Sequence, residues 1–149
     1  MMMDELVIFR KQLDLKELEN ELLKLDQVEI PTDHKFMGGI YLRSIVVPAG
    51  TLIIGKRHRN ETCNILLTGI MSIYIGEDQP TKRLTGPCIF RSDPGSKKMG
   101  YAHTDCVFMN LHPTNETDLD KIEAEFIIPE EEFLFHGAKS PEEVELCLG

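Results

Sequence analysis

The sequence predicts an all-β core, an antiparallel β-sandwich or barrel, with helical segments at both ends. Short β-prone runs alternate with Gly and Pro from residue 39 to residue 112, at the spacing of about 8–12 residues that is typical of sandwiches and barrels. No helical segment separates these runs, which excludes a parallel α/β fold because parallel strands need crossover connections. The eight predicted strands cover residues 40–47, 51–54, 63–67, 70–75, 82–85, 87–91, 97–102 and 105–112.

The chain divides into three parts. A length of 149 residues suits one core with terminal appendages. We expect an N-terminal helix and linker over residues 1–34, the barrel over 35–113, and an acidic C-terminal arm with short helices over 114–149. At 42% hydrophobic and 28% charged residues, the composition lies outside the ranges of disordered and membrane chains.

The N-terminal segment has the clearest helical period. Asp14 and Glu17 form a capping box, and the leucines at positions 15, 18, 22 and 25 fall on one face of a helix over residues 14–26. We expect this face to cover the end of its own domain, and the alternative is an oligomerisation or docking helix. Pro31 ends the helix, and residues 32–34 are predicted to be a linker.

The C-terminal arm carries the whole charge excess. Residues 1–115 hold 14 acidic and 14 basic residues, whereas residues 116–149 hold 11 acids against Lys121 and Lys139, which accounts for the net charge of −9. Thr117 and Asp120 predict a short helix over 118–125, and Ser140-Pro141 predicts the start of another. The aromatic residues of the arm suggest that it docks on a basic surface of this chain, a second copy or another protein.

The composition also limits the partners. A chain without a basic excess disfavours nucleic-acid binding, and no apolar run approaches the ~18 residues of a membrane span. The four cysteines show no CxxC or zinc-ribbon spacing, so we expect reduced thiols. We also expect no cofactor.

Alternation along the strands predicts which side chains face the core. We expect inward positions at Ile45, Val47, Ile65, Leu67, Ile73, Val107 and Met109. His112 alternates with these residues and is therefore expected at the surface.

Residues 55–69 resemble the first motif of the cupin superfamily, in which an HxH pair, a Glu and a Gly flank a strand pair and supply metal ligands. Pro94-Gly95 and His103 are similar to the second motif. By this resemblance, the candidate metal ligands are His58, Glu61 and His103, and His112 is a weaker fourth candidate. Lys56 replaces the first histidine, and its positive charge disfavours a metal ion, so we expect a barrel without metal.

The same region suggests an anion site. Basic side chains edge the predicted mouth of the barrel, where they would hold a nucleotide or a sugar phosphate. The candidate ligand-binding residues are Lys56, Arg57, His58, Arg59, Lys97 and Lys98.

A wider resemblance covers residues 39 to about 125. The matching segments look like a small family of tailed-bacteriophage proteins with a cupin-like jelly-roll barrel and no established activity; they are Gly39-Ile40-Tyr41-Leu42-Arg43, Pro48-Ala49-Gly50-Thr51-Leu52, Gly55-Lys56-Arg57-His58, Asn64-Ile65-Leu66, Gly69, Pro94-Gly95, Gly100-Tyr101-Ala102, Asp105, His112 and 117–123. The resemblance implies a structural or accessory virion protein, such as a decoration, adaptor or fibre-docking module. It would form homo-oligomers, contact other virion proteins, and pass from the host cytoplasm into the virion. The alternatives are a binding protein for a small anionic ligand and, ranked last, a metal-dependent cupin isomerase or oxygenase; no residue pattern indicates a catalytic nucleophile.

Overall fold

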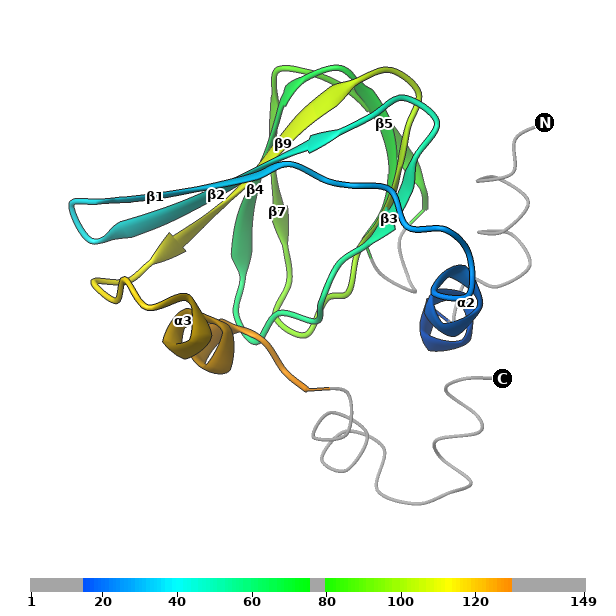
Figure 1. Cartoon of the computed structure of the whole chain (residues 1–149). Coiled ribbons are helices and arrows are strands. Elements are labelled where there is room, and N and C mark those ends of the chain that lie inside the picture. The colour runs from blue at the N-terminus through cyan, green and yellow to red at the C-terminus, as the bar shows by residue number, and fades with distance from the viewer. Residues whose placement is uncertain (1–14, 76–79, 130–149) are drawn as a thin grey trace.

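The computed structural model describes residues 15–75 and 80–129. In the described chain, nine strands form two antiparallel sheets that face each other (Figure 1). The strands are β1 (Thr32–Met37), β2 (Ile40–Val47), β3 (Leu52–Ile54), β4 (Thr62–Thr68), β5 (Ile70–Tyr74), β6 (Lys82–Thr85), β7 (Cys88–Ser92), β8 (Met99–Ala102) and β9 (Cys106–Pro113). The larger sheet has the order β1-β2-β9-β4-β7 and the smaller one the order β3-β8-β5-β6. The predicted antiparallel barrel is confirmed.

The core lies between the two sheets. Buried side chains from both sheets pack into one cluster, made of Ile45, Val47, Leu66, Met71, Ile73, Ile75, Ala102, Cys106 and Phe108. Gly69 makes the tight turn from β4 to β5 with a positive φ of 97°. A Cβ at this position would collide with the carbonyl oxygen of Asp105, so the turn requires glycine.

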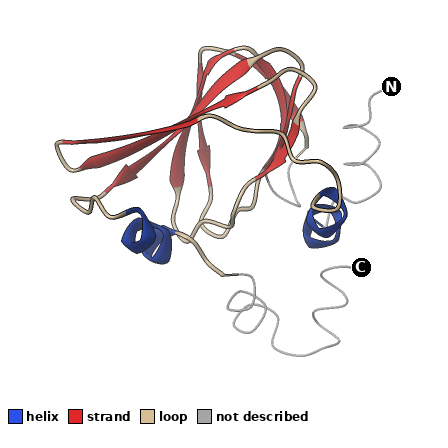
Figure 2. Ribbon diagram, in the orientation of Figure 1, coloured by secondary structure: helices blue, strands red, loops and turns tan. Residues whose placement is uncertain are grey.

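The two helices lie at the same end of the barrel (Figure 2). Helix α2 (Leu15–Leu22) packs Leu15 against Tyr74 and Met99, which confirms that this helix covers the end of its own domain. Helix α3 (Leu119–Phe126) begins one residue after its predicted start, and Asp118 caps it by accepting from the backbone N–H of Asp120 at 2.9 Å. No helix in the described ranges has the length and hydropathy needed to cross a bilayer.

Helix α3 closes one end of the larger sheet. Its Ile122 and Phe126 are buried against Tyr41 at the start of β2. Figure 1 shows α3 at the end where β9 stops and the chain turns back toward the barrel. The predicted second helix near residue 140, and Phe133 and Phe135 of the arm, lie outside the described residues.

The predicted linker at residues 32–34 is wrong, because these residues form the first half of β1. All six residues of β1 are exposed, so the strand has no amphipathic alternation to reveal it. It forms because β2 offers its free edge, with Thr32 opposite Ile45 and Met37 opposite Ile40.

The predicted faces of β4 and β9 are also wrong, although Ile45, Val47 and Ile73 are buried as predicted. Ile65, Val107 and Met109 are only half-buried, and Leu67 is exposed. The inward positions are Thr62, Asn64 and Leu66 on β4 and Cys106, Phe108, Asn110 and His112 on β9. Polar side chains therefore enter the interior from both strands.

Candidate ligand-binding site

A cavity of about 410 Å³ lies inside the barrel at the end that α3 covers. Its walls come from both sheets, from the segment that follows β3, and from α3. The lining residues are His34, Tyr41, Arg43, Ile45, Ile53, Ile54, Gly55, Lys56, His58, Met71, Ile73, Lys98, Met99, Gly100, Phe108, Asn110, His112, Leu119, Ile122, Glu123, Phe126 and Ile127. Volumes of this size are typical of small-molecule sites.

Strand register arranges this wall in rows. Ile45 lies opposite Phe108, and Phe108 lies opposite Leu66, so the deepest row is apolar. The next row on the same face is polar: Arg43 lies opposite Asn110, and Asn110 lies opposite Asn64. The row nearest α3 places Tyr41 opposite His112. The cavity therefore has an apolar floor and a polar, aromatic rim.

Lys98 brings a positive charge into this cavity. It directly precedes β8, and its carbonyl oxygen accepts from the backbone N–H of Gly55 at 2.9 Å, which fixes its position. Its Nζ is buried and has no hydrogen-bond partner. Burial lowers the pKa of Lys98 to about 8.

Arg43 adds a second positive charge from the inward face of β2. The structure shows no hydrogen bond or ion pair between its guanidinium and another described residue. Among the described lining residues the one acid is Glu123, whose carboxylate pairs with Lys56. The positive charges of Lys98 and Arg43 are therefore not neutralised within the cavity.

Two neutral histidines line the same space. The rings of His58 and His112 stack with centroids 5.4 Å apart. The ring of His112 also packs against that of Phe126, with centroids 4.8 Å apart. Burial, followed by the charge of Lys98, lowers the pKa of His58 to about 3 and that of His112 to about 4. Both imidazoles are therefore uncharged at neutral pH.

A tyrosine and a histidine connect the cavity to solvent. The Tyr41 hydroxyl lies 2.7 Å from Nδ1 of His34, which is on the exposed strand β1. Burial raises the pKa of Tyr41, so its hydroxyl keeps its proton at neutral pH. The ring of Tyr41 also stacks on that of His112, with centroids 5.8 Å apart.

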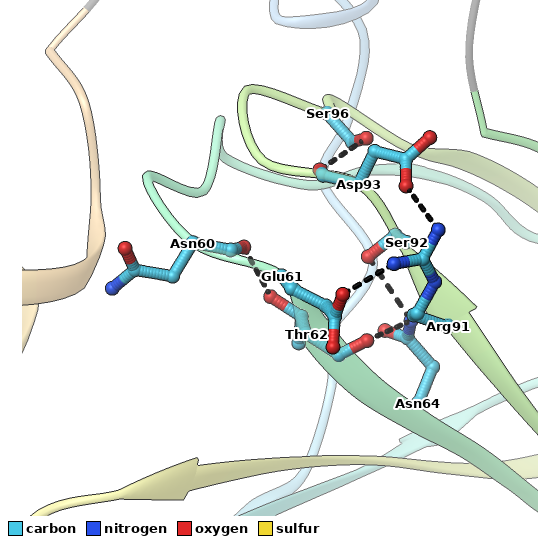
Figure 3. A network of polar contacts seen from close by, with 8 residues as sticks. All are labelled: Asn60, Glu61, Thr62, Asn64, Arg91, Ser92, Asp93 and Ser96. Atoms are coloured by element: carbon cyan, nitrogen blue, oxygen red, sulfur yellow. Dashed lines mark hydrogen bonds and ion pairs between the residues drawn. The ribbon is translucent and has the colours of Figure 1, made fainter.

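A buried amide network supports the polar row. Asn110 Nδ2 donates to Asn64 Oδ1 at 2.7 Å, and Asn64 Nδ2 donates to the Ser92 hydroxyl at 3.1 Å. Figure 3 shows Asn64 pointing toward Ser92, with Arg91 between Glu61 and Asp93. These bonds hold the Asn110 side chain in one orientation at the cavity wall.

The structure brings together some of the predicted ligand-binding residues. His58 and Lys98 line the cavity, and Lys56 lies at its rim. Arg57 donates to the carbonyl of Gly95 at 2.7 Å, and the backbone N–H of Arg59 donates to the carbonyl of Phe126 at 2.8 Å. Lys97 is buried and pairs with Glu19 of α2. Two adjacent lysines thus have different roles.

The three nominated metal ligands are not assembled. His58 lines the cavity, but Glu61 and His103 do not. Glu61 pairs with Arg91 at the surface, and the ring of His103 lies 2.7 Å from the Ser72 hydroxyl. In residues 15–75 and 80–129, no three His, Cys, Asp or Glu side chains are grouped so as to hold a metal ion. A cation, Lys98, also lies close enough to lower the pKa of both cavity histidines. The residues of this cavity do not fit a metal ion.

Sequence reasoning missed Arg43 and Asn110, placed His112 at the surface, and gave Tyr41 no role. A signal for them exists in the chain. Polar or aromatic residues two positions apart recur near one end of each of three strands, as Tyr41-x-Arg43, Thr62-x-Asn64 and Asn110-x-His112. Such pairs share one face of a strand, and their recurrence marks a polar interior.

Solved structures show which fold this is. The chain matches ectoine synthase from P. lautus with a TM-score of 0.53 and 15% identity, over 70% of this chain and 78% of that one. It matches a cupin superfamily protein from Desulfitobacterium hafniense with a TM-score of 0.51 and 8% identity, over 63% and 85% of the two chains. The barrel is a cupin-like jelly roll.

The cupin-like barrel is also shared with KdgF from Halomonas sp., at a TM-score of 0.50 and 13% identity over 64% of this chain and 90% of that one. No protein-family model matches the sequence, and no curated protein matches it significantly. At these identities the likeness establishes the fold of the cupin-like barrel and leaves its ligand to be argued from the cavity itself.

Proposed function

We propose that this cupin-like protein binds a small organic anion inside its barrel. The observation that carries the proposal is the Lys98 ammonium, which is buried in the cavity without a hydrogen-bond partner. Burying an unpaired charge costs several kcal/mol, so a buried unpaired ammonium is best explained by an anionic ligand that pairs with it. Arg43 supplies a second donor group that suits a carboxylate or a phosphate.

The remaining walls describe the body of the ligand. Apolar side chains form the deep part of the cavity, including Ile45, Met71, Ile73 and Phe108. An anion with a hydrocarbon portion would place that portion on these residues and its charge near Lys98 and Arg43. This supports a small carboxylic acid or organic phosphate as the ligand.

The other predicted functions have less support. A structural role in a virion, with a homo-oligomer and other virion proteins as partners, rests on the sequence resemblance and needs no buried cation in the barrel. It stays a prediction, which mass spectrometry of purified particles would test. A metal-dependent enzyme would need ligands that the described cavity does not assemble.

The binding proposal is tested by thermal unfolding with a panel of small carboxylates and phosphates. A ligand that binds the folded state raises the melting temperature in proportion to its occupancy. We expect Lys98→Met to abolish the rise and to fold normally, because methionine replaces a buried unpaired charge. Lys82→Met, on exposed strand β6, is the matched control and should respond like the wild type. Absence of any response in the wild type across the panel would overturn the proposal.

A further inference from the structure

The side chain of Lys98 has a chemical property that anion binding does not use. Its terminal amine is buried in a largely apolar cavity and makes no hydrogen bond that would hold its proton. A desolvated lysine amine is a nucleophile toward carbonyl groups. We propose that Lys98 forms an imine with the carbonyl group of a short oxo acid held in the cavity, an inference that rests on the proposed anion binding.

The protonation state of Lys98 supports this reaction. With a pKa of about 8 instead of 10.5, about half of the amine is neutral at pH 8. An ordinary lysine has well under 1% of neutral amine at that pH. A site that only held an anion would benefit from a fully charged ammonium, which burial here opposes.

Arg43 indicates where the acid group of the substrate would bind. The Arg43 guanidinium lines the same cavity, and its planar donors suit a carboxylate in a two-point contact. Because Arg43 and Lys98 line the same cavity, the proposal places the carboxylate on Arg43 and a neighbouring carbonyl of the same molecule against the Lys98 amine. The apolar floor then accepts a short hydrocarbon chain, so the substrate class is a small 2-oxo acid.

The reaction needs no oxidant or reductant. The neutral Lys98 nitrogen attacks the carbonyl carbon, the C–N bond forms as the C=O double bond becomes single, and one proton passes from nitrogen to oxygen to give a carbinolamine. The C–O bond then breaks, and the oxygen leaves as water with the second proton of the nitrogen, which yields the neutral imine; hydrolysis reverses the sequence. The Tyr41 hydroxyl, which lines the cavity and is hydrogen-bonded to His34, can relay the proton between nitrogen and oxygen, whereas their low pKa values make the imidazoles of His58 and His112 weak bases.

Borohydride trapping tests the inference on the full chain. The protein is incubated at pH 8 with glyoxylate, pyruvate or 2-oxobutyrate and sodium cyanoborohydride, which reduces an imine to a stable secondary amine. Peptide mass spectrometry then locates the adduct. We expect about one adduct per chain, at Lys98, formed about tenfold faster than at exposed Lys82 for at least one of the three acids.

Three controls separate imine formation from binding. Lys98→Arg keeps the positive charge and should keep the thermal response to lactate, which has no ketone, while losing the adduct. Lys82→Met should label like the wild type. Lactate in excess should slow labelling at Lys98 and leave exposed lysines unaffected.

The possible outcomes distinguish imine formation from anion binding alone. Saturable labelling at Lys98, slowed by lactate, supports the imine. Labelling at Lys98 no faster than at Lys82 with all three acids overturns it, and a lactate-dependent rise in melting temperature would then leave the binding proposal standing. Because the adduct is mapped on the wild-type chain, the test does not depend on the folding of a variant.

Discussion

The ammonium of Lys97 and the carboxylate of Glu19 lie 3.3 Å apart and join α2 to the chain just before β8. The Lys97 side chain is only 3% exposed, whereas that of Glu19 is 25% exposed. Lys98, the next residue, points into the cavity instead. Lys97 thus holds α2 on the barrel, whereas Lys98 places a positive charge in the cavity.

Removing this ion pair should destabilise the protein. Glu19→Gln takes away a carboxylate that faces a buried ammonium, and we expect a loss of about 1–3 kcal/mol in the free energy of unfolding. Urea unfolding measures the loss. Glu21→Gln is the matched control, because Glu21 pairs with Lys24 at the surface and should contribute less than about 0.5 kcal/mol. Equal effects of the two variants would contradict the role given to Glu19.

The leucine face of α2 gives a second prediction. Leu18 packs beside Leu15 on the barrel, so Leu18→Asp places a carboxylate in an apolar contact and should cost about 2 kcal/mol or more. Leu25→Asp is the control, since Leu25 lies beyond α2 and is 62% exposed. Thermal unfolding of both variants distinguishes them, and a normal melting temperature for Leu18→Asp would refute the packing.

The buried amide pair gives a third prediction. Asn110→Ala removes the donor to Asn64 Oδ1 and leaves that oxygen unsatisfied, at a cost of about 1–3 kcal/mol. It also removes a polar group from the cavity wall, so ligand affinity should fall as well. Asn115→Ala, at an exposed position, serves as the control in both urea unfolding and ligand titration. A variant as stable as the control would show that the amide bond contributes nothing net.

The two cavity histidines predict a dependence on pH. Their pKa values in the folded state, about 3 for His58 and about 4 for His112, lie below the ordinary 6.5. The unfolded state therefore binds more protons between about pH 3 and 6.5, so the stability is fully present above pH 6.5 and is lost as the pH falls through 4 toward 3. We expect the free energy of unfolding to fall over this window, by less than the full pKa shifts imply because both rings are partly solvated.

The variant His58→Gln tests this origin of the acid sensitivity. It should lose less stability between pH 7 and pH 4 than the wild type, because it removes one of the two buried imidazoles that must become charged. Denaturant unfolding at several pH values gives both curves. Identical slopes for His58→Gln and the wild type would assign the acid sensitivity to other groups.

The outer face of the larger sheet is a candidate contact surface for the predicted homo-oligomer. The outward residues of β4 and β9 are uncharged, and Ile89 on neighbouring β7 is 71% exposed. We propose that the predicted homo-oligomer forms by packing this face on the same face of a second copy. A two-fold axis makes such a face self-complementary, and its uncharged centre on β4 and β9 does not suit the acidic arm. Ile89→Lys should reduce the mass measured by analytical ultracentrifugation, and Val28→Lys, at an exposed apolar position elsewhere, should not. A wild-type chain that is monomeric at high concentration would contradict the proposal.

The sequence alone determined the features that depend on local chemistry. Gly and Pro between β-prone runs predicted the antiparallel barrel and most strand positions, because turn geometry is set by the residues at the turn. The leucine period predicted α2, which ends at Leu22 instead of residue 26, and the local signal of Thr117 and Asp120 predicted α3 to within one residue, although Asp118 is the residue that caps it. Each of these signals acts over a few residues and needs no knowledge of the rest of the chain.

The tertiary structure decided which face of each strand looks inward. Alternation with a period of two defines two faces, but β9 carries apolar residues on both, so the period cannot say that Phe108, Asn110 and His112 are inside. Only the placement of the second sheet and of α3 makes that face the interior. The same holds for Lys97 and Lys98: adjacent in sequence, they lie on opposite sides of the chain, and only the packing of α2 gives one of them a carboxylate and leaves the other unpaired in the cavity.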